Sequence, residues 1–312
     1  MTPPPYLTKA DLPSAPDWPM LVTALEAGHK APRAEVTDVF LGPPERTLLS
    51  RAARIPGMGS GVKSVTVLPE NADRNLPTIQ GAMLVFDDET GRHMATLDSA
   101  LVTNLKTVAD SLLGAKLLAR PDSRRLLIVG AGSVAKTLAG AYPILFPGLE
   151  RIEVWNRSTD KAEALAQKLS GNPVPVTAVS DLQTAVQHAD IISTATLARA
   201  PVVLGDWLQP GAHLDLIGAF SADMREVDDT ALKRARLFVD SRDTTLHHIG
   251  ELKIPLAEGV IKSKDILADL YDLAGGTPGR IAPSDITLFK NGGGAHLDLM
   301  TAFALVESAG TP

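Results

Sequence analysis

The sequence predicts an α/β protein in which a Rossmann-type, doubly wound parallel sheet is joined to a strand-rich α+β domain. Two observations predict the parallel sheet: a buried strand that runs into a glycine-rich turn, and a regular alternation of strands and helices from residue 126 onward. A third observation predicts the other domain. Residues 46–98 read as consecutive strands, with no helical pattern of comparable length between them.

Composition excludes several classes of function. The 312 residues can form one large core or two ordinary ones, and a hydrophobic content of 45% with 21% charged residues is typical of soluble globular proteins. A net charge of −6 argues against nucleic-acid or anionic-membrane partners. The absence of cysteine excludes disulfides, thiolate catalysis and cysteine metal sites, and no histidine spacing indicates a metal. With no secretory signal and no membrane-spanning stretch, we expect a cytoplasmic protein.

The first domain begins with a short helical pattern at residues 20–26 and continues as strands. Residues 87–91 combine Asp, Thr and Gly between two strands, which is typical of a hairpin turn. A helix over 100–119 follows, with Ser99 as its expected cap and Pro121 beyond its end. The expected strands are 46–52, 61–67, 78–86 and 93–97.

The glycine-rich turn has the spacing of a dinucleotide-binding loop. Leu126–Val129 is a short apolar run that predicts a buried strand, and Gly130 permits the tight turn after it. Gly132 leaves room for a pyrophosphate, and Ala135 lets the next helix pack closely. The alternative is a tight strand-to-helix turn without a ligand. The expected cofactor contacts here are Gly130, Ala131, Gly132, Ser133 and Val134.

The alternation after this turn completes the sheet. The predicted strands are 126–129, 151–155, 174–179, 190–196, 213–219, 237–240 and 285–290, and the predicted helices include 136–142, 162–169, 182–188 and 295–308. Because the sheet is complete before residue 291, we expect the last helix to return to the first domain. The predicted domains are therefore 1–120 with 291–312, which binds substrate and dimerises, and 121–290, which binds the dinucleotide.

Many short motifs occur in the order seen in one known family. They are 61–65, 76–78, 87–91, 97–98, 103–107, 129–135, 155–158, 211–213, 226–229, 239–241 and 287–290. Together they resemble the ornithine cyclodeaminase/mu-crystallin family from about residue 40 to the end. The resemblance implies homodimers joined through the first domain and a small amino-acid or imino-acid substrate bound between that domain and the nicotinamide.

The resemblance also implies three cationic residues that bind the substrate carboxylate: Arg46, Lys63 and Lys106. Cationic donors in a dry site suit a carboxylate, although Lys106 stands where the family has arginine and so lacks the planar fork. Each residue has another interpretation. Arg46 can be a solvated charge beside Glu45, and Lys106 can pair with Asp110 one turn on. Lys63, set in an apolar strand, is also a candidate catalytic proton donor, because burial near other cations lowers a lysine pKa.

Cofactor choice depends on the end of the strand 151–155. Where NAD-binding units place an acidic residue for the ribose, this chain has Asn156, Arg157 and Ser158. Arginine suits the 2′-phosphate of NADP, so we expect NADP rather than NAD. The alternative is an ordinary helix start, with Ser158 as the cap and Arg157 in solvent. By resemblance, Thr107, Thr194 and Thr196 also contact the cofactor.

The expected function is reduction of a small cyclic imine carboxylate, such as 1-pyrroline-2-carboxylate, by NADP-dependent hydride transfer. Two alternatives stay open: a cyclodeaminase-type lyase with bound NAD, and a non-catalytic protein whose ligand binding depends on the dinucleotide. The resemblance implies that cyclodeaminases carry an aspartate after the strand near residue 218 to activate the distal amine. This chain has Phe220 and then Ser221 there, and mu-crystallin has serine at the position, so the residue matches neither closely.

Replacing Arg157 with alanine tests the expected cofactor. A hydrogen bond to a charged group contributes about 1.5–3 kcal/mol, so the variant should lose about tenfold to a hundredfold in NADPH affinity. NADH affinity should change little, because NADH lacks the 2′-phosphate. Fluorescence titration of both cofactors into wild type and Arg157→Ala measures this, and equal wild-type affinities for NADPH and NADH would contradict the expectation.

Overall fold

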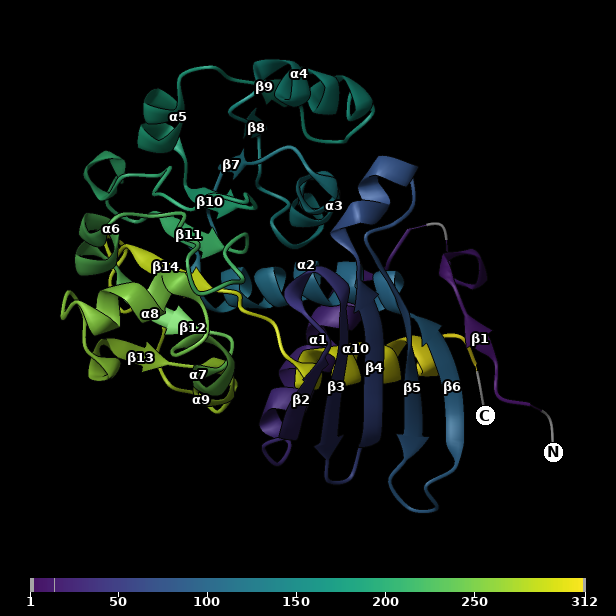
Figure 1. The fold of residues 1–312 in the computed structure, drawn as a ribbon. Helices are drawn as coiled ribbons and strands as arrows, with labels where there is room; N and C mark the ends of the chain where they lie inside the picture. The colour runs from purple at the N-terminus through teal and green to yellow at the C-terminus, as the bar shows by residue number, and fades with distance from the viewer. Residues whose placement is uncertain (1–2, 14, 311–312) are drawn as a thin grey trace. The chain divides into compact units, whose positions relative to one another are not determined.

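The computed structural model describes residues 3–13 and 15–310. Its described residues form two compact units (Figure 1). Unit 1 comprises the chain up to Ala109 together with the residues from Gly294 onward, and unit 2 comprises Asp110–Gly293. Within the described residues, no helix combines the length and apolar character needed to cross a bilayer.

Unit 1 is built on a six-stranded sheet with the order β1-β6-β5-β4-β3-β2. Neighbouring strands are antiparallel, except that β1 runs parallel to β6. The predicted strand 46–52 begins one residue later than expected, so Arg46 lies in a short 3-10 turn before it. The strands are β1 (Tyr6–Leu7), β2 (Glu35–Leu41), β3 (Thr47–Ile55), β4 (Gly59–Val67), β5 (Ile79–Asp87) and β6 (His93–Asp98).

The hairpin turn between β5 and β6 is confirmed. The Asp87 carboxylate accepts hydrogen bonds from the backbone N–H groups of Glu89, Thr90 and Arg92. Gly91 has φ +67°, a left-handed conformation that glycine adopts without steric cost. The side chain of Asp87 and the backbone freedom of Gly91 thus fix this turn locally, which is why the sequence predicts it.

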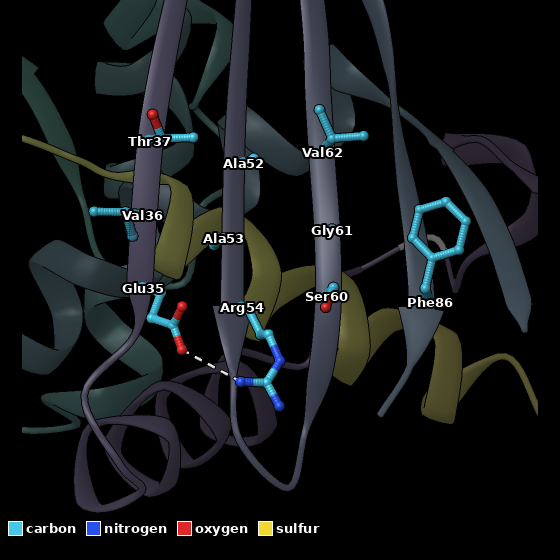
Figure 2. A pocket seen from close by; sticks show the side chains of 10 residues that line it. All are labelled: Glu35, Val36, Thr37, Ala52, Ala53, Arg54, Ser60, Gly61, Val62 and Phe86. Carbon is cyan, nitrogen blue, oxygen red and sulfur yellow. Dashed lines mark hydrogen bonds and ion pairs between the residues drawn. The ribbon is translucent and has the colours of Figure 1, made fainter. Parts of the chain in front are cut away.

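One face of this sheet packs against α10 (Ala295–Ser308), and α10 in turn packs against α1 (Trp18–Lys30). Residues at alternate positions of β4, among them Gly61 and Lys63, are buried on this side. A Cβ atom at Gly61 would lie 2.7 Å from Leu299 Cδ1, so the glycine lets α10 approach the sheet closely. On the other face, a groove crosses β2, β3, β4 and β5 (Figure 2). Helix α10 lies in the same unit as β1–β6.

Helix α2 (Ser99–Leu118) belongs to unit 1 as far as Ala109 and to unit 2 from Asp110. The expected cap at Ser99 is wrong, because Ser99 is already the first helical residue. Asp98 supplies the cap instead: its Oδ1 accepts the Leu101 N–H at 2.8 Å. A carboxylate at this position also offsets the partial positive charge of the helix start.

Unit 2 contains eight parallel strands in the order β13-β12-β14-β11-β10-β7-β8-β9. The strand order reverses direction between β7 and β10, as in a doubly wound sheet, so this prediction is confirmed. The strands are β7 (Arg125–Val129), β8 (Arg151–Trp155), β9 (Val176–Ala178), β10 (Ile191–Thr194), β11 (His213–Leu216), β12 (Arg236–Val239), β13 (Ile266–Ala268) and β14 (Thr287–Lys290). The helices are α3 (Ser133–Leu145), α4 (Thr159–Lys168), α5 (Leu182–His188), α6 (Asp229–Arg234), α7 (Arg242–Thr245), α8 (Gly250–Ala257) and α9 (Leu270–Ala274).

A fully buried carboxylate ties several of these elements together. Asp215 on β11 accepts hydrogen bonds from Ser193 Oγ (2.6 Å), Ser111 Oγ (2.8 Å) and the Tyr142 hydroxyl (3.1 Å). Burial raises the pKa of Asp215 to about 6, although the three hydroxyl groups act in the opposite direction. The carboxylate therefore links β11 with β10, α3 and the unit 2 part of α2.

Replacing Asp215 with alanine should destabilise unit 2, because the three hydroxyl groups would lose a buried acceptor. We expect the free energy of unfolding to fall by about 2–5 kcal/mol. The control Asp206→Ala removes an exposed carboxylate and should change it by less than about 0.5 kcal/mol. Urea denaturation followed through Trp155 and Trp207, which both lie in unit 2, measures the effect. Equal losses in the two variants would contradict it.

Candidate functional site

A cluster of cationic side chains lies inside unit 1. Lys63 on β4 is 5% exposed, and Lys106 on α2 is 7% exposed. Arg51 lies on β3 directly opposite Lys63 in the strand register. The alternation of β4 turns Lys63 toward the same side as the buried Gly61 and Val65, which places its charge against α10.

The partners of these cations differ. Lys63 Nζ donates to Asp298 Oδ1 at 2.7 Å and to Thr103 Oγ1 at 3.1 Å. Arg51 forms an ion pair with Asp38 at 2.9 Å. Within residues 3–13 and 15–310, the Lys106 ammonium has no hydrogen-bond or ion-pair partner, and the expected alternative pairing with Asp110 is not formed. The cluster thus carries one positive charge that lacks an acidic partner in these residues, which suits binding of an anion.

Burial lowers the pKa of Lys63, because it disfavours the charged ammonium. The nearby charges of Lys106 and Arg51 lower this pKa further, and Asp298 opposes them. A lysine whose proton is held less tightly than usual can act as a general acid closer to neutral pH.

Arg46 is placed differently from the expectation. It lies in the 3-10 turn Pro44–Arg46, and its guanidinium forms an ion pair with Glu70 in which the Arg46 side chain is 62% exposed. Arg51, which sequence reasoning missed, is the arginine opposite Lys63. The signal that could have found it is Gly57, because a hairpin centred on this residue pairs residue 51 with residue 63.

The glycine loop of unit 2 fits a dinucleotide. Gly130 has φ +126°, and a Cβ atom there would lie 2.5 Å from Ala195 O, so only glycine suits this position. A Cβ atom at Gly132 would meet nothing within 4 Å, which leaves open space beside the start of α3. The helix has Gly132 as its N-cap without a side-chain cap, so no capping side chain competes for the first N–H groups of α3. The predicted close packing of Ala135 is confirmed, because it is fully buried.

The residues expected at the cofactor ribose follow β8. Arg157 is exposed, and among the described residues its guanidinium has no ion-pair partner. Ser158 occupies the N-cap position of α4, but its side chain makes no capping hydrogen bond, so the alternative interpretation of Ser158 as a side-chain cap is wrong. Asn156 Nδ2 donates to Ser158 O at 3.0 Å, which shapes the turn around Arg157.

Glu226 organises the loops after β10 and β11, and sequence reasoning missed this role. Its Oε1 accepts Thr196 N (2.9 Å) and Thr196 Oγ1 (2.8 Å), and its Oε2 accepts Gly218 N (2.6 Å) and Ala219 N (3.2 Å). The backbone N–H of Glu226 donates in turn to Glu251, whose pKa burial raises to about 7. Only the Glu-Val-Asp-Asp motif at 226–229 could have signalled it.

The three threonines expected at the cofactor lie in different places. Thr196 is fixed by Glu226, and Thr194 is fully buried at the end of β10. No described residue hydrogen-bonds the Thr194 hydroxyl. Thr107 is half-buried on the unit 1 part of α2, whereas Thr194 and Thr196 belong to unit 2.

The loop after β11 exposes an apolar side chain. Phe220 is 66% exposed. Asp223, the acid that could replace a cyclodeaminase aspartate if the loop were shifted, accepts a hydrogen bond from Ser221 Oγ at 2.7 Å and forms an ion pair with Arg199. The Asp223 carboxylate is thus engaged by Ser221 from its own loop and by Arg199 from the loop after β10.

A sequence model described as the ornithine cyclodeaminase/mu-crystallin family matches residues 53–311 of this chain. The chain belongs to this family. The resemblance inferred from the short motifs is therefore confirmed, and so is the fold class.

Individual family members are similar over nearly their full length. The Delta(1)-pyrroline-2-carboxylate reductase of Paracoccus denitrificans is 56% identical over 300 residues, which cover 96% of this chain and 95% of the relative. The Thermococcus litoralis Delta(1)-pyrroline-2-carboxylate reductase, solved with NADH and L-proline, matches with a TM-score of 0.89, 29% identity and 97% coverage of both chains. A dimeric archaeal alanine dehydrogenase with bound NAD has the same TM-score of 0.89 at 27% identity, covering 97% of this chain and 95% of its own.

Proposed function

We propose that this family member reduces a small cyclic imine carboxylate, such as 1-pyrroline-2-carboxylate, with a nicotinamide dinucleotide as reductant. The observation that carries the proposal is the 56% identity, over nearly the whole of both chains, to a Delta(1)-pyrroline-2-carboxylate reductase. The buried cation cluster of unit 1 and the open glycine loop of unit 2 supply the two binding functions that this reaction needs.

The side chains of unit 1 bind the substrate and supply its proton. Lys106 and Arg51 bind the carboxylate, and Lys63 donates a proton to the imine nitrogen. The bound cofactor supplies the hydride that forms the new C–H bond at the imine carbon. In the balanced step, the C=N double bond becomes a C–N single bond, the Lys63 N–H bond breaks, and an N–H bond forms on the ring. Lys63 then regains its proton from water.

The residues of unit 2 bind the dinucleotide. Gly130–Val134 line the pyrophosphate. Thr194 ends β10 and Thr196 follows it by two residues, at the edge of the sheet where nucleotides bind in doubly wound folds. We propose NADP as the preferred cofactor, because Arg157 is exposed and available to a 2′-phosphate. From the family resemblance, we also propose that Thr107 contacts the cofactor and that Arg46 contacts the substrate.

We also propose that the protein is a homodimer joined through the open sheet face of unit 1. The lining of the groove in Figure 2 includes Thr37, Ala52 and Val62, which lie beside one another on neighbouring strands. Large apolar side chains of the neighbouring strands are exposed, among them Val39 (46%) and Leu41 (57%). A chain without cysteine also suits a reducing cytoplasm, which we propose as its location.

NADPH oxidation tests the function directly. Wild type should consume one NADPH for each 1-pyrroline-2-carboxylate reduced to proline, and should release no ammonia from ornithine, since Phe220 cannot hold a distal ammonium. Lys63→Met should lose about 100-fold or more in kcat, because it removes the proton donor, while NADPH affinity stays nearly unchanged.

Lys116→Met is the control for lysine removal, because this residue lies near the end of α2, outside the cation cluster. It should retain wild-type turnover. Ornithine-to-proline conversion with ammonia release would contradict the reductase proposal. Normal turnover by Lys63→Met would show that Lys63 is neither proton donor nor carboxylate ligand.

The dimer is tested by sedimentation. Wild type should sediment at twice the chain mass of 32.9 kDa. Val62→Lys should shift the protein toward the monomer, because it replaces an apolar side chain of the groove lining with a charged one. Leu267→Lys, a change at an exposed apolar residue of unit 2, should leave the mass unchanged. A monomeric wild type, or a Val62→Lys variant that stays dimeric, would argue against this interface.

A further inference from the structure

The Lys63 ammonium has a fixed direction. An ammonium carries three N–H groups. One is donated to Asp298 Oδ1 at 2.7 Å and a second to Thr103 Oγ1 at 3.1 Å. Because α10 and α2 hold these two acceptors, the third N–H can point in only one remaining direction. In the described part of the chain, that third N–H has no acceptor.

Asp298 is placed to act on Lys63 alone. It lies in the first turn of α10, is 1% exposed, and its two carboxylate oxygens are each 2.7 Å from Lys63 Nζ. Its Oδ2 accepts no hydrogen bond from any residue that the structure describes. Burying a carboxylate with a single charged partner raises the free energy of the folded state. Such a carboxylate is therefore better explained by its effect on that partner than by fold stability.

We propose that Asp298 is a positioning residue that holds the Lys63 ammonium with its third N–H directed at the imine nitrogen of the substrate. The proposal deepens the reductase function and rests on it, because it assigns the residue that prepares the proton donor. Asp298 itself does not touch the reacting atoms.

The charges around Lys63 give Asp298 a second effect. The positive charges of Lys106 on α2 and Arg51 on β3 both lower the pKa of Lys63. The same two cations also lower the pKa of His296 on α10. Asp298 favours the charged form, through its negative charge and its hydrogen bond. After Lys63 has given its proton to the imine nitrogen, the neutral amine lies beside the Asp298 carboxylate, which favours uptake of a new proton from water.

The pH dependence of kcat tests this role. A proton donor must be protonated, so wild-type kcat should fall as the pH rises through the pKa of Lys63. In Asp298→Asn the ammonium loses its counter-charge, so the same fall should occur about one pH unit lower or more. At pH 8, kcat should be lower than in wild type by about tenfold, with a smaller change in KM.

Two further variants separate positioning from packing. Glu307→Gln makes the same acid-to-amide change at the exposed end of α10 and should leave the pH profile unchanged. Asp298→Glu keeps the charge and should restore the high-pH fall to near its wild-type position. If Asp298→Asn lowers kcat equally at every pH, or leaves kcat intact, the positioning role is wrong.

Chemical labelling provides a measurement that does not need turnover. Acetic anhydride acetylates only the neutral amine. The extent of Lys63 acetylation, measured by mass spectrometry at a series of pH values, therefore follows the fraction of Lys63 that has lost its proton. Labelling of Lys63 should begin at lower pH in Asp298→Asn than in wild type or Glu307→Gln, and coincident curves would overturn the proposal. If labelling shifts as expected but no cyclic imine oxidises NADPH, the reductase function fails while the coupling between Asp298 and Lys63 stands.

Discussion

The central constraint in unit 1 is the burial of the Lys63 ammonium at the interface between the sheet and α10. The two elements pack closely at this interface. Leu299 and Phe303 of α10 approach Gly61 and Gly59 of β4 so closely that a Cβ atom at either glycine would clash with them. A charge at such an interface must be compensated, and Asp298 and Thr103 do so. Buried ion pairs of this kind are rarely more stabilising than apolar side chains of the same volume. The pair is therefore better explained by the need for a dry, oriented cation than by the stability of the fold.

In unit 2, buried carboxylates fix the backbone of loops that follow the strands. Glu226 binds backbone N–H groups from two loops at once, and Asp240 accepts those of Gly292 and Gly293 after β14. The fully buried Lys290 provides compensating positive charge to Glu226, Glu251 and Asp240. These loops all leave the carboxyl edge of the parallel sheet, where doubly wound folds bind their ligands. Rigid strand ends are what a precisely placed nicotinamide requires, because a misplacement of about 1 Å costs about 100-fold in rate.

Local sequence patterns predict most of the secondary structure but few of the contacts within the site. The bounds of β8 and α10 match the sequence prediction because periodicity and glycine breaks are local signals. Strand β2 was missed, since all seven of its residues are exposed and no alternation marks it. Within the site, Lys63 and Asp298 are 235 residues apart, so no local pattern could join them. Arg51 was missed for a similar reason, because its position opposite Lys63 depends on the strand register, which the sequence alone does not give.

The charge balance of the cluster also separates the two reactions that this family suggests. An imine carboxylate carries one negative charge, which matches the charge of Lys106, a lysine without an acidic partner in the described part of the chain. Its ring carries no further charge. Ornithine brings the same carboxylate and a distal amine with an unperturbed pKa near ~10, which must be held as a cation and then deprotonated. The loop after β11 offers Phe220 for that task, while Asp223 is engaged by Arg199 and Ser221. A second cation near the cluster would meet further positive charge, and a cation beside Phe220 would meet an apolar side chain. Each of these surroundings raises the free energy of cation binding. The electrostatics of this chain thus favour a substrate that has already lost its second amine, which is the chemical description of a cyclic imine.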